Sequence, residues 1–219
     1  MSSITAPASI DAQLITYNNG CSTGVYVGSS GVVTSANAAW FASNSINGVL
    51  NVAFDVDDAT FNNTDMTLIS SILFGKVGLV DTGPSPGYNT VNQVQTLIAA
   101  VYALDQLKTR GGANWNVLVH CVSGGSRSVA VAALWMAQRL PIVPTPHQTR
   151  FETALDLVRT ARGFGSQPYD PTDPNAGGYG DGKPMASHFY AGQAIDQTMA
   201  LFPSMGTTPP TGWPAVLSG

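Results

Sequence analysis

Residues 117–136, VLVHCVSGGSRSVAVAALWM, constrain the fold more than any other part of the chain. The first three residues are apolar and predict a short buried strand. The residues after Cys121 are small or polar and predict a tight loop, and the apolar run that begins at Ser128 predicts a buried helix. A strand, a short loop and a helix in this order predict an α/β fold with the loop at the carboxyl end of a strand.

The composition of this loop is typical of an anion-binding site. It consists of Val122, Ser123, Gly124, Gly125 and Ser126. Backbone N–H groups of such a loop can point inward, and the following helix N-terminus adds its positive end. Arg127 follows directly, and its planar guanidinium can bind two phosphoryl oxygens. We therefore expect the loop and Arg127 to bind a phosphate group.

Cys121 is expected at the floor of this loop. The amide dipoles that favour phosphate also favour a thiolate, so the pKa of the thiol should fall below its free value of about 8.5. A thiolate under a bound phosphate is a nucleophile directed at phosphorus. Ser128 is expected to donate its hydroxyl to the sulfur and assist its departure. His120 is expected to order the loop through hydrogen bonds rather than to act as the base.

The run HCVSGGSRS resembles the signature of the cysteine-dependent protein phosphatases, and its Gly-x-Ser-Arg-Ser ending is similar to that of the dual-specificity branch. The segments VYVGS at 25–29 and GVLNVA at 48–53 resemble the opening of the same family. The resemblance implies a single α/β domain with a central, mostly parallel twisted sheet flanked by helices. It also implies a phosphatase that hydrolyses phosphomonoesters through a phosphocysteine intermediate, with phosphotyrosine and phosphoserine or phosphothreonine in proteins as substrates.

The phosphatase reaction needs an acid to protonate the leaving oxygen and then a base to activate water. Asp81 follows a strand predicted at 76–80 and precedes a Gly/Pro-rich loop. The family carries such an aspartate on a loop upstream of the cysteine, so the resemblance assigns the role to Asp81. The separation from Cys121 is longer than is common in the family. Asp57 and Asp58 are therefore alternatives, and a turn-capping role for Asp81 stays open.

Arg162 ends a helix predicted at 149–162, and the segment VRTAR resembles a family segment near the rim of the pocket. The resemblance implies that Arg162 contacts a second phosphate or the pocket rim. A cation that interacts with a helix C-terminus is an equally good interpretation.

The rest of the chain predicts the scaffold. A hairpin is expected at 14–17 and 25–28, a short helix at 37–41, a strand at 49–54 and an amphipathic helix at 90–108. The catalytic domain is expected to span 1–203, with a Gly/Pro-rich insertion at 163–184, and residues 204–219 to form an extended tail. The segment 55–65 holds four aspartates, and we interpret it as a solvated loop rather than a calcium site.

Charge and composition limit the partners. Charged residues make up 10% of the chain, the net charge is −4 and no basic run is present, so neither a nucleic-acid surface nor an anionic-membrane surface is expected. No signal peptide, membrane span, metal-ligand cluster or cofactor motif is found in the sequence. We expect a cytoplasmic, reducing location, a phosphorylated protein or peptide as partner, and phosphate or a similar oxyanion in the pocket.

Several alternatives stay open. The same loop chemistry serves phosphoinositides and RNA 5′ ends, although a loop without Lys or Arg weighs against highly anionic inositol phosphates. A phospho-recognition module without turnover is a further candidate. Cys21 could protect Cys121 in a disulfide, although a small side chain near a turn is the favoured interpretation of Cys21.

Overall fold

The computed structural model describes residues 10–18, 20–56, 58, 72–80, 90–110, 115–142 and 150–163. All statements on structure below concern these residues. Asp57, Asp81, the insertion beyond Gly163 and the tail at 204–219 lie outside them, as do the limits predicted for the catalytic domain.

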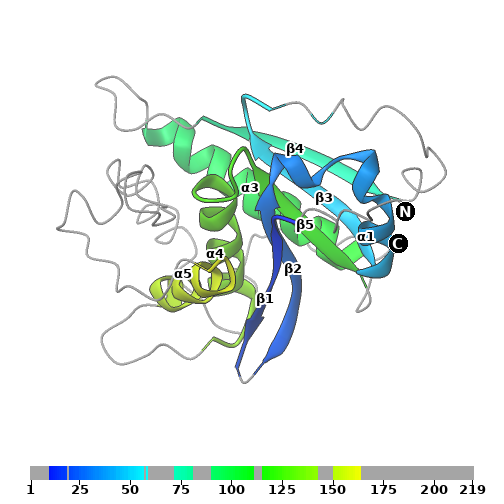
Figure 1. Ribbon diagram of the computed structural model, residues 1–219. Coiled ribbons are helices and arrows are strands. Elements are labelled where there is room, and N and C mark those ends of the chain that lie inside the picture. Colours follow the sequence, from blue (N-terminus) through cyan, green and yellow to red (C-terminus); the bar gives the residue numbers. More distant parts are fainter. Residues whose placement is uncertain are drawn as a thin grey trace, which may run out of the picture.

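The chain folds into an α/β domain around a five-stranded sheet (Figure 1). The strands are β1 (Ala12–Tyr17), β2 (Cys21–Ser29), β3 (Ile46–Ala53), β4 (Leu73–Leu79) and β5 (Asn116–Cys121). The helices are α1 (Ala38–Ser43), α3 (Thr90–Arg110), α4 (Arg127–Arg139) and α5 (Arg150–Ala161), with single 3-10 turns at Ser30–Val32 and Ser35–Asn37. The strand order is β1-β2-β5-β3-β4, in which only the β1–β2 pair is antiparallel. This architecture confirms the predicted mostly parallel sheet flanked by helices.

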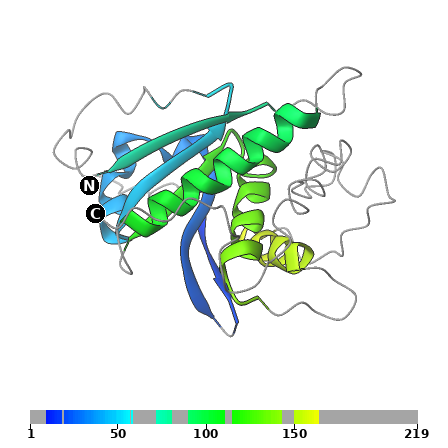
Figure 2. The same ribbon diagram turned by 180° about the vertical axis from the view of Figure 1, so that it is seen from behind.

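The helices cover both faces of the sheet. In the two opposite views, α3, α4 and α5 lie on one face and α1 on the other (Figures 1 and 2). The strands supply apolar side chains to both faces, because successive residues of a strand point in opposite directions. In β2, for example, Val25 and Val27 belong to the larger apolar cluster, and Tyr26 belongs to the smaller cluster under α1.

Strand β5 lies in the middle of the sheet, between β2 and β3. Residues Val117, Leu118 and Val119 are fully buried, as their unbroken apolar run predicts. The carboxyl ends of three parallel strands meet at one edge, where Cys121 pairs with Ser29 of β2 and His120 pairs with Asn51 of β3. The loop after β5 therefore begins where these strands end, which is the edge where sites form in parallel α/β sheets.

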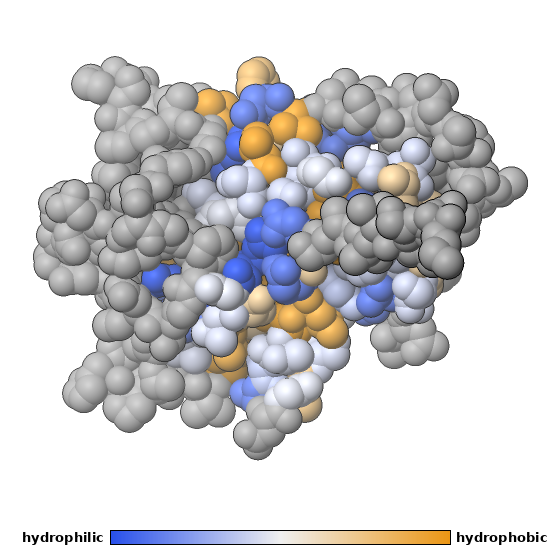
Figure 3. All heavy atoms as spheres, viewed as in Figure 1, coloured by the Kyte–Doolittle hydropathy of each residue, from blue (hydrophilic) through white to orange (hydrophobic). Residues whose placement is uncertain are grey.

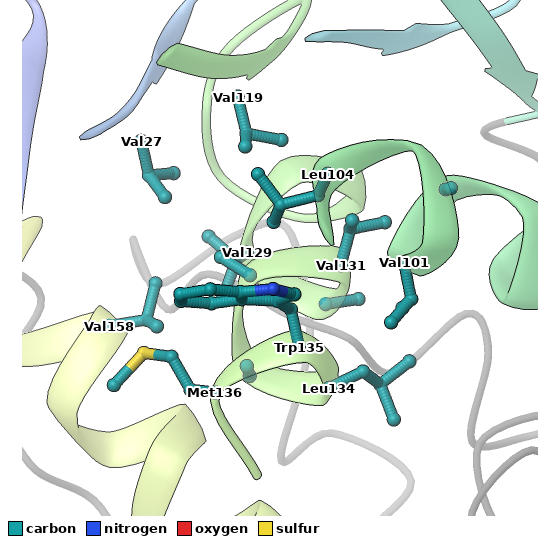
Figure 4. Packing of buried hydrophobic residues seen from close by; sticks show 14 of the residues in the cluster. Val27, Val101, Leu104, Val119, Val129, Val131, Leu134, Trp135, Met136 and Val158 are labelled. Atoms are coloured by element: carbon teal, nitrogen blue, oxygen red, sulfur yellow. The ribbon is translucent and has the colours of Figure 1, made fainter. Parts of the chain in front are cut away.

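Helix α4 is buried on all sides, as its composition predicts. Its side chains pack between the strands, α3 and α5, with the Trp135 ring in the middle of this layer (Figure 4). The indole Nε1 of Trp135 donates to Asp105 Oδ1 at 3.2 Å, and Arg139 Nη2 donates to Asp105 Oδ2 at 2.6 Å. These contacts hold α4 in a fixed position against α3, and so fix the loop that leads into α4.

The described surface in the view of Figure 1 carries hydrophilic side chains in its middle, with apolar side chains beside them (Figure 3). Large exposed apolar side chains among the described residues are Phe54, Phe74 and Val122. Phe54 and Val122 each adjoin, in sequence, a residue of the site described below.

We predict that Leu134→Ala lowers the free energy of unfolding by about 2–5 kcal/mol, because Leu134 is fully buried in α4 and its truncation leaves a cavity. Urea unfolding followed by circular dichroism measures the change. Val122→Ala, at a side chain that is 41% exposed, is the control and should change stability by no more than about 0.5 kcal/mol. Equal effects of both substitutions would contradict the position assigned to α4 in the core.

Candidate active site

The loop after Cys121 is fixed by a close contact with the end of β2. Gly124 has φ +70°, in the left-handed region, and a Cβ on it would lie 2.6 Å from the carbonyl carbon of Gly28. Glycine is therefore required at position 124 both by the backbone conformation and by the space. The backbone N–H of Ser30 donates to the carbonyl of Val122 at 3.0 Å and holds the first loop residue against the turn that follows β2.

Arg162 binds the loop from its outer side. Its Nε donates to the Gly124 carbonyl at 3.1 Å, and its Nη2 donates to the Ser123 carbonyl at 3.3 Å. Its Nη1 forms an ion pair with Asp11 at 2.9 Å. In a trans peptide the N–H points away from the preceding carbonyl, so the N–H groups of Gly124 and Gly125 are directed away from Arg162. This contact orients loop amides as an anion site requires.

The position of Arg162 differs from the rim position that the sequence resemblance implies. Its side chain is only 3% exposed, whereas a side chain at the rim would be open to solvent. The reason is that several backbone carbonyls converge on this guanidinium, which carries five N–H donors.

Cys121 lies at the end of β5 and is 1% exposed. Its Sγ is 3.4 Å from the Ser128 hydroxyl. Burial alone would raise the pKa of the Cys121 thiol. The hydroxyl and backbone N–H of Ser128, the charge of Arg127 and the backbone N–H of Gly124 outweigh burial and lower the pKa below its ordinary value. The site therefore favours a thiolate at Cys121.

Arg127 is the first residue of α4 and is 1% exposed. Its Nη1 donates to the Leu79 carbonyl at 3.2 Å and also forms an ion pair with Asp55. The hydrogen bond from Arg127 holds the pKa of the Asp55 carboxyl below its usual value. The residue expected to bind phosphate thus lies beside Cys121 and already contacts a carboxylate.

His120 is fully buried next to the nucleophile. Its Nδ1 lies 3.3 Å from the Cys121 carbonyl, and its Nε2 lies 3.3 Å from Asp58 Oδ2. Both neighbours of the ring are acceptors. These contacts make His120 and Asp58 a pair that connects the segment after β3 with the end of β5.

The interpretation of 55–65 as a solvated loop is incomplete for Asp55 and Asp58. The Asp55 side chain is exposed, as expected, but both carboxylates also pair with residues of the signature. The sequence contained a usable signal, because Asp55 comes two residues after the end of β3 at the same sheet edge as Cys121. The same rule points to Asp81, which lies outside the described residues.

The two cysteines lie at opposite ends of β2. Cys121 pairs with Ser29 at the end of that strand, and Cys21 is its first residue. Eight residues (29 − 21) separate the two ends, which corresponds to about 26 Å at the rise of an extended strand. A disulfide needs Cα atoms within about 7 Å, so this fold does not allow a bond between Cys21 and Cys121. Both thiols are free.

The part of the chain that the structure describes carries neither a metal-binding cluster nor a membrane-spanning helix. Within it, no group of three or more His, Cys, Asp or Glu side chains could hold a metal ion. None of its helices combines the length and the apolar character needed to cross a membrane.

No protein-family model matches the sequence, and no curated protein matches it. Solved structures do match. Human DUSP28 has a TM-score of 0.55 at 14% identity, over 90% of this chain and 98% of its own. A mouse protein described as a dual specificity phosphatase, solved with zinc tungstate, has a TM-score of 0.53 at 15% identity, over 91% and 96% of the two chains.

A third similar structure is the human tyrosine phosphatase-like serine/threonine/tyrosine-interacting protein, with a TM-score of 0.53 at 14% identity over 82% of this chain and 93% of its own. The structural neighbours are thus dual-specificity and tyrosine phosphatases and a phosphatase-like protein, over most of the chain. The chain has the dual-specificity phosphatase fold, as its signature predicted.

We predict that the Cys121 thiol titrates below an ordinary cysteine and that Ser128→Ala raises its pKa, because the Ser128 hydroxyl lowers that pKa. The measurement is the rate of alkylation by iodoacetamide against pH, made in a Cys21→Ser background because Cys21 is exposed. Val122→Ala serves as the control and should leave the titration unchanged. A thiol that titrates at about 8.5 or above in the parent protein would contradict the geometry of the site.

Proposed function

We propose that this protein is a phosphatase that hydrolyses phosphomonoesters through a phosphocysteine intermediate. The observation that carries the proposal is the arrangement around Cys121. A buried thiol with a lowered pKa lies 3.4 Å from a hydroxyl and is followed by a loop whose amides and arginine suit a phosphate. The tungstate in the mouse neighbour supports an oxyanion site in this fold.

In the first step of the proposed reaction, the Cys121 thiolate attacks phosphorus. The S–P bond forms as the bond from phosphorus to the leaving oxygen breaks. Arg127 and the loop amides of residues 122–126 stabilise the equatorial oxygens. We propose that Asp81 donates a proton to the leaving oxygen, which departs as an alcohol or phenol.

In the second step, water attacks the phosphocysteine. Asp81, now a carboxylate, accepts a proton from that water, and the S–P bond breaks. The electron pair returns to sulfur, where the Ser128 hydroxyl stabilises the thiolate. Inorganic phosphate is the product. No step draws on a cofactor.

Phosphotyrosine in proteins, together with phosphoserine and phosphothreonine, is the substrate class that we favour. The loop residues 122–126 carry no cation, and Asp55 and Asp58 add negative charge beside the site, so polyanionic substrates would be disfavoured. Val122 and Phe54, which are 41% and 67% exposed, offer apolar surface next to site residues and suit an aryl leaving group. A reactive thiol also requires a reducing compartment, and we propose the cytoplasm.

Phospho-recognition without turnover is the second candidate. One observation supports it, because the fold is shared with a phosphatase-like interacting protein. The two candidates differ in one measurable property, which is release of inorganic phosphate.

We predict that the parent protein hydrolyses para-nitrophenyl phosphate and that Cys121→Ser lowers turnover at least about a thousandfold, because the nucleophile is lost. The Cys121→Ser protein should still bind inorganic phosphate by calorimetry, since the loop and Arg127 remain. Cys21→Ser is the matched control and should keep full turnover. Hydrolysis at the parent rate by Cys121→Ser would refute the proposed mechanism, and binding without any turnover by the parent would establish the second candidate.

We predict that Asp81→Asn lowers kcat about a hundredfold, because general acid catalysis of this kind contributes at least that factor. A general acid must carry its proton, so the parent rate should fall as the pH rises through its pKa. This basic limb should become flat in Asp81→Asn. An unchanged pH profile would transfer the acid role to another residue, and Asp57→Asn is the first variant to test in that case.

A further inference from the structure

The Asp55 carboxylate forms an ion pair with the arginine that the proposed function assigns to phosphate. Arg127 is 1% exposed, whereas the Asp55 side chain is 55% exposed. A single nitrogen of Arg127, Nη1, serves two acceptors, Asp55 Oδ1 and the Leu79 carbonyl. The Asp55 carboxylate therefore lies directly at the guanidinium, where its charge acts on anything that Arg127 binds.

The segment that carries Asp55 is held in place by four other hydrogen bonds. Asn51, which is fully buried, donates from Nδ2 to the Val56 carbonyl at 3.0 Å and accepts from the backbone N–H of Ala53 at 2.8 Å. Lys76 Nζ also donates to the Val56 carbonyl, at 2.6 Å. The backbone N–H of Phe54 donates to the Leu79 carbonyl at 3.1 Å, the same oxygen that Arg127 contacts. Asp55 is thus fixed on both sides, not carried by a free loop.

The charge balance at the site follows from these positions. Among the described residues, the charged or titratable side chains at the signature are Arg127 and His120, the Cys121 thiol, and the carboxylates Asp55 and Asp58. Lys76 adds a positive charge that also acts on Asp55 from β4. Arg162 contacts the loop through backbone carbonyls and pairs with Asp11. Phosphate arrives with one to two negative charges, so a fixed carboxylate at Arg127 repels it while the guanidinium attracts it.

We propose that Asp55 is a positioning residue for Arg127. Its charge also lowers the affinity of the site for inorganic phosphate and so favours release of the product. The inference rests on the proposed function, because it assumes that Arg127 binds the phosphate. It assigns a role in that function to Asp55, which lies outside the signature and follows β3. Asp55 acts through Arg127 and need not touch the phosphate.

The test measures inorganic phosphate binding by calorimetry in the Cys121→Ser background, where no turnover occurs. Asp55→Asn keeps the size of the side chain and removes its charge. It should tighten phosphate binding about three- to tenfold, the effect of removing one partly exposed unit charge near the phosphate. Asp55→Glu restores the charge and should bind phosphate close to the parent affinity. Asp156→Asn, at a residue of α5 that pairs with Arg159, removes the same charge elsewhere and should leave the affinity unchanged.

A second measurement distinguishes an effect of the Asp55 charge from a purely structural role of Asp55 in holding Arg127. In the Cys21→Ser background with Cys121 intact, Asp55→Asn should lower the pKa of the Cys121 thiol, because Arg127 then acts on the sulfur without a competing carboxylate. If Asp55 only held Arg127 in place, its loss would release the guanidinium and raise that pKa. Phosphate binding that is unchanged or weaker in Asp55→Asn, or a raised thiol pKa, overturns the inference.

The result of the phosphate-binding test does not depend on whether the protein is catalytically active. Tighter phosphate binding in Asp55→Asn, together with a parent protein that releases no phosphate from esters, would support the inference and defeat the proposed hydrolysis. Absence of any phosphate binding by the Cys121→Ser protein would overturn both. Thermal unfolding of each variant establishes that it is folded at the temperature of the measurement.

Discussion

The close packing of Gly124 on the carboxyl end of β2 is the constraint on which the site depends. A Cβ on Gly124 would lie 2.6 Å from the carbonyl carbon of Gly28, so the two backbones approach more closely than a side chain at position 124 would allow. Arg162 completes this contact by binding the carbonyls of Ser123 and Gly124. The loop is therefore held from outside by β2 and by Arg162, which directly follows α5, and the Gly124 amide remains directed toward Cys121. The parallel pairing of β5 with β2 supplies the register that makes the contact possible.

The site balances positive and negative groups within a small volume. Loop amides, Arg127 and the Ser128 hydroxyl favour a negative sulfur, and they outweigh the burial that opposes it. The aspartates of the segment after β3 act in the other direction, at Arg127 and at His120. A site of this kind stabilises a thiolate and, with Asp55 acting as proposed, binds inorganic phosphate less tightly than Arg127 alone would. Such a balance suits an enzyme that must bind an ester and then release inorganic phosphate.

Much of the fold and part of the site could be predicted from the sequence, because the responsible patterns are local. The apolar run of β5, the small residues of the loop and the buried composition of α4 each specify their structure over a few residues. The contacts of Asp55 and Arg162 were missed or misjudged because they depend on long-range geometry. Asp55 and Arg127 are 72 residues apart in sequence, and they meet only because β3 and β5 are neighbours in the sheet. The local sequence at the end of α5 does not show that Arg162 lies against Gly124, because this contact depends on the tertiary fold.

The most direct measurement of the central claim is identification of the covalent intermediate. The protein would be mixed with a phosphotyrosine peptide, quenched in acid within milliseconds and digested for mass spectrometry. The account predicts one added phosphoryl group on the peptide that contains Cys121, present before phosphate release reaches its steady rate and missing from Cys121→Ser. Hydrolysis of the peptide without a phosphoryl group on Cys121 at any time, or with one on another residue, would contradict the account.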